Sequence, residues 1–456
     1  MKVLLTAPPF EDLDSTENKG HLRASPNLGL YLLAAILEEA GHQVKLVDPI
    51  DFDAAFNPET RAATLAGVSA LLLSANSCTW PRTRSLLFDL EAAGLRPLSI
   101  LGGPHGSTLD EHLLRSSPVD YIVRGEGERA LPELLAALAA GRDPARVPGL
   151  SFLRGDQPVS NPQGPLLTPG ELAALPLPRF DLMPAGYYDL LPVETSRGCH
   201  HACIFCSVSF RRSWRGLAPA DVISRLERQT PFLERTRERA FFLIDDCFSA
   251  DHDRLAGLAD GLAGFLHPLC FEARIGDVIA PGVIDSLVRL PIEVMEMGVE
   301  CGYEPGLSRV GKKLTLPEVE RAAGILLGHD FRDRARFSFV MGLPGESRRE
   351  IEKTLAYAFK LAGRLGSRLI VSWLTVFPGS IVWKKKAEWG IEIEPADYDL
   401  ERWWRREDVF RRCHPALDPD RDLEAVLTYV QLLIKLFPNI RHDGFFRELA
   451  RRENQP

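Results

Sequence analysis

The chain has 456 residues, of which 45% are hydrophobic and 25% charged, as expected of a globular protein with two or three domains. This composition excludes a disordered, collagen-like or coiled-coil description of the whole chain. The net charge of −8 argues against a strongly basic nucleic-acid binder. No apolar run reaches the roughly 18 residues that span a bilayer, and the stretch before Pro8 is too short for a secretory signal. We therefore expect a cytoplasmic protein with no membrane partner.

Strands and helices alternate in residues 1–150. The predicted strands are the short apolar runs Val3–Thr6, Val44–Val47, Ala70–Leu73, Leu98–Leu101 and Tyr121–Val123. Leu28–Ala40 and Ala130–Ala140 have the apolar spacing of helices. Because strands that alternate with helices form parallel sheets, we predict a doubly wound, Rossmann-like domain with ligands at the carboxyl ends of its strands.

A second α/β series follows a Pro- and Gly-rich segment, residues 151–191, which is expected to be a linker with a small hairpin. The second series occupies residues 192–385, and its predicted strands are Val193–Ser196, Ala240–Ile244, Leu269–Ala273, Glu293–Gly298, Arg336–Met341 and Leu369–Leu374. Six such units suit a partial (βα)6 barrel of the TIM type. Residues 386–456 are predicted to form a small helical region with one strong helix, Leu423–Leu436. The fold class is therefore α/β.

Three of the eight cysteines form a C-x3-C-x2-C pattern, Cys199, Cys203 and Cys206, directly after the first strand of the second series. Thiolates suit iron–sulfur clusters and zinc. A structural zinc site would need a fourth ligand, which His200 or His201 could supply only with strain. Three cysteines leave one iron of a [4Fe–4S] cluster without a protein ligand, open to chemistry. The pattern favours a cluster over zinc and over three buried thiols.

This pattern, with Phe205 before the last cysteine, resembles the signature of radical S-adenosylmethionine (SAM) enzymes. The resemblance implies that Cys199, Cys203 and Cys206 each bind one iron and that SAM chelates the fourth. It implies that an electron from the cluster cleaves SAM to methionine and a 5′-deoxyadenosyl radical. An external donor of the flavodoxin or ferredoxin type would supply that electron. The backbone at Phe205 would contact the adenine.

Later motifs resemble the same family. The resemblance places Asp246, Arg274 and Glu300 at the SAM site, and Cys301 stands where the family usually has Ser. For Asp245 and Asp246, a helix N-cap is an equally favoured role for one of the two. The lysines that follow, Lys312 and Lys313, are expected to be solvated. The other cysteines away from the triad are expected to be dispensable for the cluster: Cys78, Cys247, Cys270 and Cys413.

The first domain resembles the cobalamin-binding-type domain that is fused to one radical SAM subclass. The turn at Gly102 and Gly103 and the segment 124–128 carry this resemblance. The subclass includes methyltransferases, a ring cyclase, and lipid and antibiotic enzymes. Two alternatives stay open: bound cobalamin, or the fold without the cofactor, as in the aminoglycoside-pathway diol dehydratase. The loop 74–80 would lie beneath a bound corrin, where Trp80 would either cap the lower face or fill the pocket.

The main functional expectation is deoxygenation of a small polar metabolite, such as an amino sugar, in natural-product biosynthesis. The radical would remove hydrogen from a carbon that bears a hydroxyl, and a neighbouring C–O bond would break. Candidates for the general acid or base are Asp245, Asp246, Glu304 and Glu346. The alternative is cobalamin-dependent radical C-methylation or ring cyclisation. A remote alternative is a non-catalytic iron–sulfur or nucleic-acid-binding protein, suggested by the aromatic and basic residues 402–406.

Overall fold

The computed structural model describes residues 1–10 and 24–440, which divide into two compact units. Unit 1 contains residues 1–10, 26–185 and 394–406, and unit 2 contains most of the remainder. The first unit thus includes residues that the sequence assigned to a linker and to the C-terminal region. Neither unit has, within the described residues, a helix long and apolar enough to cross a membrane.

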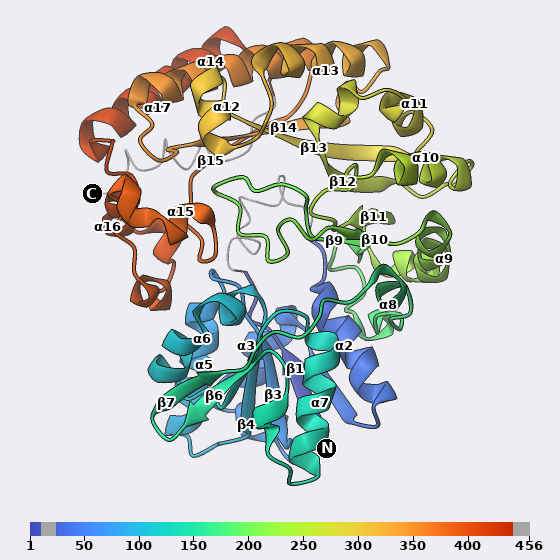
Figure 1. Cartoon of the computed structure of the whole chain (residues 1–456), viewed down its shortest axis with the longest axis vertical. Coiled ribbons are helices and arrows are strands. Elements are labelled where there is room, and N and C mark those ends of the chain that lie inside the picture. Colours follow the sequence, from blue (N-terminus) through green and yellow to red (C-terminus); the bar gives the residue numbers. More distant parts are fainter. Residues whose placement is uncertain (11–23, 441–456) are drawn as a thin grey trace. The chain divides into compact units, whose positions relative to one another are not determined.

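A seven-stranded sheet forms the centre of unit 1 (Figure 1). Its strands are β1 (Lys2–Thr6), β2 (Gln43–Val47), β3 (Ala70–Ser74), β4 (Leu98–Gly102), β5 (Tyr121–Val123), β6 (Leu150–Arg154) and β7 (Gln157–Ser160). The order β2-β1-β3-β4-β5 is parallel throughout, and β6 and β7 are added antiparallel at one edge. The five predicted strands are confirmed to within one residue, and the order is that of a doubly wound fold.

Helices cover both faces of this sheet. The helices of unit 1 are α2 (Leu28–Glu39), α3 (Phe52–Phe56), α4 (Arg61–Thr64), α5 (Trp80–Ala92), α6 (Pro104–Ser116), α7 (Gly127–Ala139) and α8 (Pro169–Ala173). One face packs Leu30 of α2 and Leu134 of α7 against Val3, Leu72 and Ile100 of the strands, all of them buried. Helix α7 begins three residues before its predicted start, because its first turn lacks the apolar spacing by which the prediction was made.

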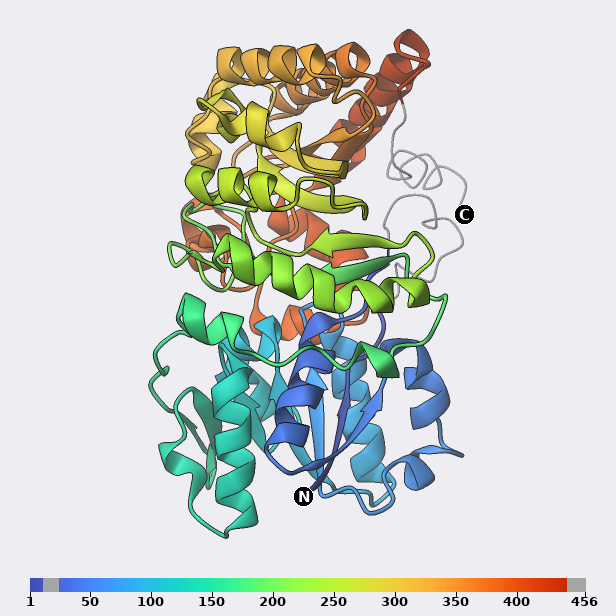
Figure 2. The same cartoon turned by 90° about the vertical axis from the view of Figure 1, so that its right-hand side faces the viewer.

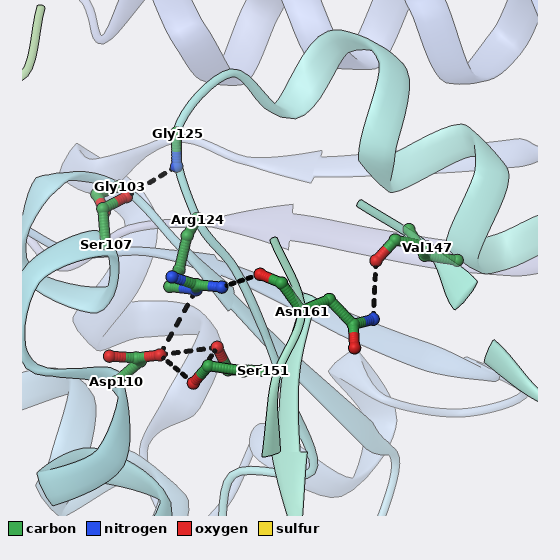
Figure 3. Close-up of polar contacts among 9 residues, drawn as sticks. Gly103, Ser107, Asp110, Arg124, Gly125, Val147, Ser151 and Asn161 are labelled. Carbon is green, nitrogen blue, oxygen red and sulfur yellow. Dashed lines mark hydrogen bonds and ion pairs between the residues drawn. The ribbon is translucent and has the colours of Figure 1, made fainter. Parts of the chain in front are cut away.

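The β6–β7 hairpin is fixed to the parallel sheet by a polar network (Figure 3). The guanidinium of Arg124 pairs with Asp110, 3.2 Å apart, and also donates to the Asn161 carbonyl. The hydroxyl of Ser151 donates to the same Asp110 carboxylate at 2.6 Å. The predicted hairpin is confirmed, but it belongs to the sheet because these contacts and its pairing with β5 hold it there.

Residues 394–406 complete unit 1 from far along the sequence. Tyr398 and Trp403 in this segment are fully buried. Trp80, at the start of α5, donates its indole N–H to the Asp399 carboxylate at 2.6 Å. Residues 394–406 are therefore part of the core of unit 1. More than two hundred residues, which belong to unit 2, separate them in the sequence from the rest of unit 1.

Unit 2 is built on an open parallel sheet of six strands, in the order β15-β14-β13-β12-β11-β8. The strands are β8 (Leu190–Val193), β11 (Ala240–Leu243), β12 (Leu269–Arg274), β13 (Ile292–Glu300), β14 (Ala335–Met341) and β15 (Leu369–Trp373). This arrangement confirms the partial (βα)6 barrel. The first strand was predicted three residues too late: the buried run Leu190–Val193 forms the sheet, and the polar residues after it form the start of the cysteine loop.

Helices lie on the outer side of the six strands, as α13 and α14 show in Figures 1 and 2. The helices of unit 2 are α9 (Pro219–Gln229), α10 (His252–Gly261), α11 (Val283–Leu287), α12 (Glu304–Val310), α13 (Leu316–Gly328), α14 (Arg348–Leu365), α15 (Ile381–Lys384), α16 (Glu407–Cys413) and α17 (Pro419–Leu436). The predicted helix Leu423–Leu436 is confirmed and begins four residues earlier, after the cap Asp418. Outward-facing side chains of the strands are buried under these helices, which leaves alternate side chains facing the concave side.

Candidate functional site

The cysteine loop lies between two short strands that pair with each other, β9 (Ser196–Arg197) and β10 (Arg215–Gly216). Gly198 precedes the first cysteine with a φ of 86°, and a Cβ there would lie 2.6 Å from the Phe210 carbonyl oxygen. Only glycine fits this close approach of two backbone segments. The backbone N–H of Ile204 donates to the Val310 carbonyl at 3.0 Å, which fixes the middle of the loop to the end of α12.

Two of the three sulfurs accept backbone hydrogen bonds. The N–H of His201 lies 3.5 Å from Cys199 Sγ, and the N–H of Val208 lies 3.5 Å from Cys206 Sγ. Such donors stabilise sulfur that carries negative charge. Burial raises the pKa of all three thiols, that of Cys206 to about 11. The thiols therefore hold their protons at neutral pH until a metal displaces them.

The cysteine loop supplies the donors that an iron–sulfur cluster uses. Thiolates are the usual protein ligands of such clusters, and in a [4Fe–4S] cluster each cysteine binds a different iron. The donor set of Cys199, Cys203 and Cys206, which share the lining of one cavity, fits this group.

A cavity of about 390 Å³ extends from these cysteines into the concave side of the strands. Seven residues that the sequence assigned to the cluster or to SAM line it: Cys199, Cys203, Phe205, Cys206, Asp246, Arg274 and Glu300. They come from the cysteine loop and from the carboxyl ends of β11, β12 and β13. The structure thus brings together residues up to about a hundred positions apart in the sequence, as a barrel with ligands at its strand ends requires.

Glu300 is held in an unusual backbone conformation. Its φ is 74°, in the left-handed region that favours glycine, and the register between β13 and β14 shifts at this residue. Such irregularities turn a side chain away from its regular direction, and they occur often at functional sites. Here the irregularity brings the Glu300 carboxylate to 2.6 Å from Nζ of Lys312, and both side chains are buried.

Lys312 was expected to be solvated, and this expectation is wrong. Its ammonium group lies in the cavity because α12 ends at Gly311, whose φ of 75° turns the chain inward. Burial acts to lower the pKa of Lys312, but the Glu300 carboxylate outweighs it, so that the pKa is raised and the lysine keeps its charge. The guanidinium of Arg274 donates to the Lys312 carbonyl oxygen. Both cations therefore meet at one wall of the cavity.

The two consecutive aspartates after β11 have different positions. Asp246 lines the cavity and accepts the Gly198 N–H at 3.0 Å, and burial raises the pKa of Asp246 to about 6. Asp245 points away and is buried, where it accepts from the backbone N–H groups and the hydroxyls of Thr195 and Ser196. Neither is a helix N-cap, since Asp251 caps α10. Asp245 shapes the start of the cysteine loop and is not placed for proton transfer.

Two further acid–base candidates lie outside the lining of this cavity. Glu304 is exposed at the start of α12 and accepts the Leu316 N–H at 2.8 Å. Glu346 is buried in the turn after β14, where the Tyr303 hydroxyl donates to it at 3.0 Å and the Gly342 N–H at 2.6 Å. Both carboxylates thus have partners within the fold, and neither lies in the lining of the cavity that the cysteines share.

Sequence analysis missed two acidic residues of the cavity, Glu272 and Glu296. They are neighbours in the register of β12 and β13 and precede Arg274 and Gly298 by two positions on their strands. The signal was present, because alternate residues of a strand share a face and Arg274 and Glu300 were already assigned to the cavity. The Glu272 carboxylate has no hydrogen bond or ion pair among the described residues. Burial, with the nearby carboxylates of Asp246 and Glu300, raises its pKa.

The glycine turn of unit 1 follows β4. Gly103 has a φ of 93°, and a Cβ there would lie 2.6 Å from the Ala75 carbonyl oxygen, so that glycine lets this turn pack on the loop after β3. The Ser107 hydroxyl accepts the Gly125 N–H and joins the two glycine turns, which Figure 3 shows. A Cβ at Gly102 would meet its nearest atoms only at 3.9 Å. Gly103 is therefore required for the packing of this turn, whereas the position of Gly102 has room for a Cβ.

Trp80 and His105 stack on each other near these turns, with ring centroids 5.4 Å apart, and both are buried. Tyr398 packs against the edge of His105, and Nε2 of His105 has no hydrogen-bond partner in the described part of the chain. Burial lowers the pKa of His105 to about 3, so the ring is neutral. Of the two alternatives for Trp80, its enclosure within unit 1 supports a role in filling the interior.

Comparison with known families agrees with the division into two units. The B12 binding domain family matches residues 24–135, and the Radical SAM superfamily matches residues 193–358. The first match contains the glycine turns of unit 1. The second contains the cysteine loop and the carboxyl ends of β11 to β14, and thus most of the cavity.

Curated relatives include methyltransferases and a cyclase. An uncharacterised methyltransferase of Pyrococcus horikoshii is 28% identical over 84% of this chain and 83% of its own length. The hopanoid C-3 methylase of Methylococcus capsulatus is 29% identical over 71% of this chain and 64% of its own. The anaerobic magnesium-protoporphyrin IX monomethyl ester cyclase of Synechocystis sp. is 29% identical over 54% of this chain. The chain spans only 49% of that cyclase.

Two solved structures share the fold. The radical SAM methyltransferase TsrM from Kitasatospora setae, solved with cobalamin and a [4Fe–4S] cluster, has a TM-score of 0.68 and 16% identity over 95% of this chain and 89% of its own. The cobalamin-dependent enzyme OxsB, solved with aqua-cobalamin, has a TM-score of 0.65 and 19% identity over 84% of this chain and 55% of its own. At these identities the likeness concerns the fold alone. The cysteine loop, the cavity and both family matches support the same assignment. The chain is therefore a radical SAM enzyme with an N-terminal domain of the B12-binding family.

Proposed function

We propose that this chain is a cobalamin-dependent radical SAM methyltransferase that acts on a carbon atom of a small polar molecule. One observation carries the proposal: the three cysteines share a cavity with Asp246, Arg274 and Glu300, in a chain that matches a methyltransferase over 84% of its length. The proposal replaces the diol-dehydratase expectation, because the matched relatives are methyltransferases and cyclases.

The residues of the cavity suit the polar groups of SAM. When bound, the cluster supplies the electron that cleaves SAM, and cobalamin supplies the methyl group. The carboxylate of Glu300 would accept hydrogen bonds from the SAM ammonium group, and the Arg274 guanidinium would donate to the SAM carboxylate. Because Lys312 already pairs with Glu300, SAM binding would exchange part of this ion pair for contacts with the ligand. Phe205 adds an apolar wall beside the cysteines.

Glu272 supports the assignment of a polar substrate. Its carboxylate faces the cavity without a protein donor in the described residues, whereas Lys312 and Arg274 are each engaged elsewhere. The Glu272 side chain is exposed in the open cavity, so a donor on a bound molecule can reach it and pair with it. We therefore propose that Glu272 accepts a hydrogen bond from a hydroxyl or ammonium group of the bound molecule.

Ring cyclisation is the second candidate. It is favoured by the 29% identity to the magnesium-protoporphyrin ester cyclase, a match that covers 54% of this chain. The match with the methyltransferase from Pyrococcus extends further, over 84% of the chain, and this difference places methylation first.

The products of SAM separate these reactions. The protein is expressed with hydroxocobalamin, reconstituted without oxygen, and reduced in the presence of SAM and a panel of small polar molecules. Methylation predicts bound cobalamin and equal amounts of S-adenosylhomocysteine and 5′-deoxyadenosine for each methylated product. If 5′-deoxyadenosine forms while S-adenosylhomocysteine stays absent with cobalamin supplied, the methyltransferase proposal is wrong and a SAM-only reaction takes its place.

A further inference from the structure

The cysteine loop has an unusual charge for this protein. Residues 197–215 contain four Arg and two His but no Asp or Glu, in a chain whose net charge is −8. Residues 308–314, which lie against the loop at Ile204 and Val310, add one Arg and two Lys and again no acid. The segments around the cysteines therefore carry an excess of positive charge, whereas the chain as a whole is negatively charged.

Most cations of the loop have internal partners. Arg197 pairs with Glu194 at 2.8 Å, Arg211 donates to the Gly379 carbonyl oxygen, and Arg215 lies over the Phe210 ring. These three guanidinium groups therefore contact other groups of the protein.

Arg212 is different. Its side chain is exposed and has no partner among the described residues, while its backbone N–H donates to the carbonyl of Cys199 at 2.6 Å. The φ of Arg212 is 60°, in the left-handed region, which costs energy for a side chain of this size. A guanidinium is therefore presented to solvent directly beside the first cysteine.

Lys313 supplies a second exposed cation beside the loop. Its φ is 51°, and its side chain too has no partner among the described residues. It follows Gly311, where a Cβ would lie 3.7 Å from the carbonyl oxygen of Ala202, between the first two cysteines. While Lys312 turns inward to Glu300, Lys313 faces solvent.

We propose that Arg212 and Lys313 form the docking surface for a small acidic redox protein that delivers the electron for SAM cleavage. This inference rests on the proposed function. Electron transfer requires the donor to approach the cluster closely, and exposed charges of one sign steer a partner of the opposite sign to that place. One electron passes from the reduced flavin of the carrier to the cluster, which leaves the carrier oxidised by one electron.

Reduction of the reconstituted holoenzyme by flavodoxin hydroquinone tests the inference. The bleaching of cluster absorbance is followed by anaerobic stopped flow at several salt concentrations, for the natural protein and for Arg212→Glu, Lys313→Glu and the double variant. Arg332→Glu is the matched control, because Arg332 is exposed and precedes the opposite, amino end of β14. Dithionite, a small reductant that needs no docking, is used in parallel.

We expect the double variant to lower the second-order rate with flavodoxin at least tenfold and to weaken its salt dependence, with each single variant in between. The rates with dithionite and the rates of Arg332→Glu should stay within twofold of the natural protein. Equal flavodoxin rates in the double variant and the natural protein would overturn the docking inference. The proposed function would still stand if the dithionite-reduced enzyme forms S-adenosylhomocysteine and 5′-deoxyadenosine together with a methylated product. A cluster that neither reductant reduces would overturn both.

Discussion

The Nζ atom of Lys312 lies 2.6 Å from Oε1 of Glu300, and both side chains are buried in the wall of the cavity that the three cysteines line. A buried ion pair of this kind contributes little net stability while it is intact, but removing one partner leaves an uncompensated charge. Removing one partner of this pair changes the charge of the cavity wall. We therefore expect such a substitution to lower the free energy of unfolding and to weaken ligand binding.

Replacing Lys312 by Met should lower the free energy of unfolding by about 3–5 kcal/mol, because the Glu300 carboxylate is then buried alone. Binding of SAM should weaken as well, since the Glu300 carboxylate loses the ammonium group that holds it in position. Denaturant titration and equilibrium dialysis with SAM measure the two effects. Lys313→Met, at the exposed neighbour, is the control and should leave both quantities unchanged; equal effects of the two variants would refute this role of Lys312.

Gly298 makes room for the same pair. A Cβ at Gly298 would collide with the Glu300 carboxylate and lie 2.7 Å from Nζ of Lys312. Gly298→Ala should therefore displace the ion pair, with weaker SAM binding and lower stability. Gly324→Ala is the matched control, because a Cβ at this helical position meets nothing within 4 Å. It should be neutral or should stabilise the protein by up to about 1 kcal/mol. A Gly298→Ala protein that binds SAM normally would contradict this account.

The raised pKa of Glu346 leads us to expect that the free energy of unfolding depends on pH. Burial raises its pKa from 4.5 to about 7, although the N–H groups of Gly342 and Leu343 and the Tyr303 hydroxyl act to lower it. The folded protein thus binds this proton more tightly than the unfolded chain, so stability should fall as the pH rises from about 4.5 to about 7. The difference between the natural protein and Glu346→Gln should change by about 1–3 kcal/mol across this window.

Urea unfolding at closely spaced pH values measures this effect. Asp285→Asn, at an exposed carboxylate, should follow the natural protein throughout. If Glu346→Gln also runs parallel to the natural protein between pH 4.5 and 7, the proton on Glu346 does not contribute as described.

The contacts of Asp399 lead us to expect that the stability of unit 1 depends on residues 394–406. Its carboxylate accepts the Trp80 indole N–H at 2.6 Å and lies 3.0 Å from Nε2 of His112. Asp399→Ala leaves the buried indole N–H without a partner, which should cost about 1–3 kcal/mol. Hydrogen exchange should then accelerate in β3 and β4 more than in β13. Glu401→Ala, at an exposed residue of the same segment, should have no effect; unchanged exchange in Asp399→Ala would show that the segment does not stabilise the sheet.

The sequence alone predicts most of the fold, because short apolar runs between turn residues mark the strands. It places all five parallel strands of unit 1 within one residue of their observed bounds, and five of the six barrel strands within two residues. The strand before the cysteines was predicted to begin at Val193, whereas the observed strand Leu190–Val193 ends there. The sequence prediction put residues 394–406 in the C-terminal region, whereas the structure includes them in unit 1. The contact between Trp80 and Asp399 joins residues more than three hundred positions apart and therefore leaves no local signal in the sequence.

The candidate site was predicted where a motif marks it and missed where geometry does. Cys199, Asp246, Arg274 and Glu300 follow from motifs and do line one cavity. Lys312 was missed because the left-handed turn at Gly311 decides which of two consecutive lysines points inward, and composition does not reveal that choice.

The central claim is that the three cysteines hold a [4Fe–4S] cluster that cleaves SAM, and iron analysis combined with product analysis tests it most directly. The oxygen-protected natural protein should contain about four iron and four sulfide per chain and form 5′-deoxyadenosine from SAM on reduction. The variant with Ala at Cys199, Cys203 and Cys206 should lack both, while Cys78→Ala retains them. A natural protein that binds zinc instead of iron, or a triple variant that still cleaves SAM, would contradict the claim.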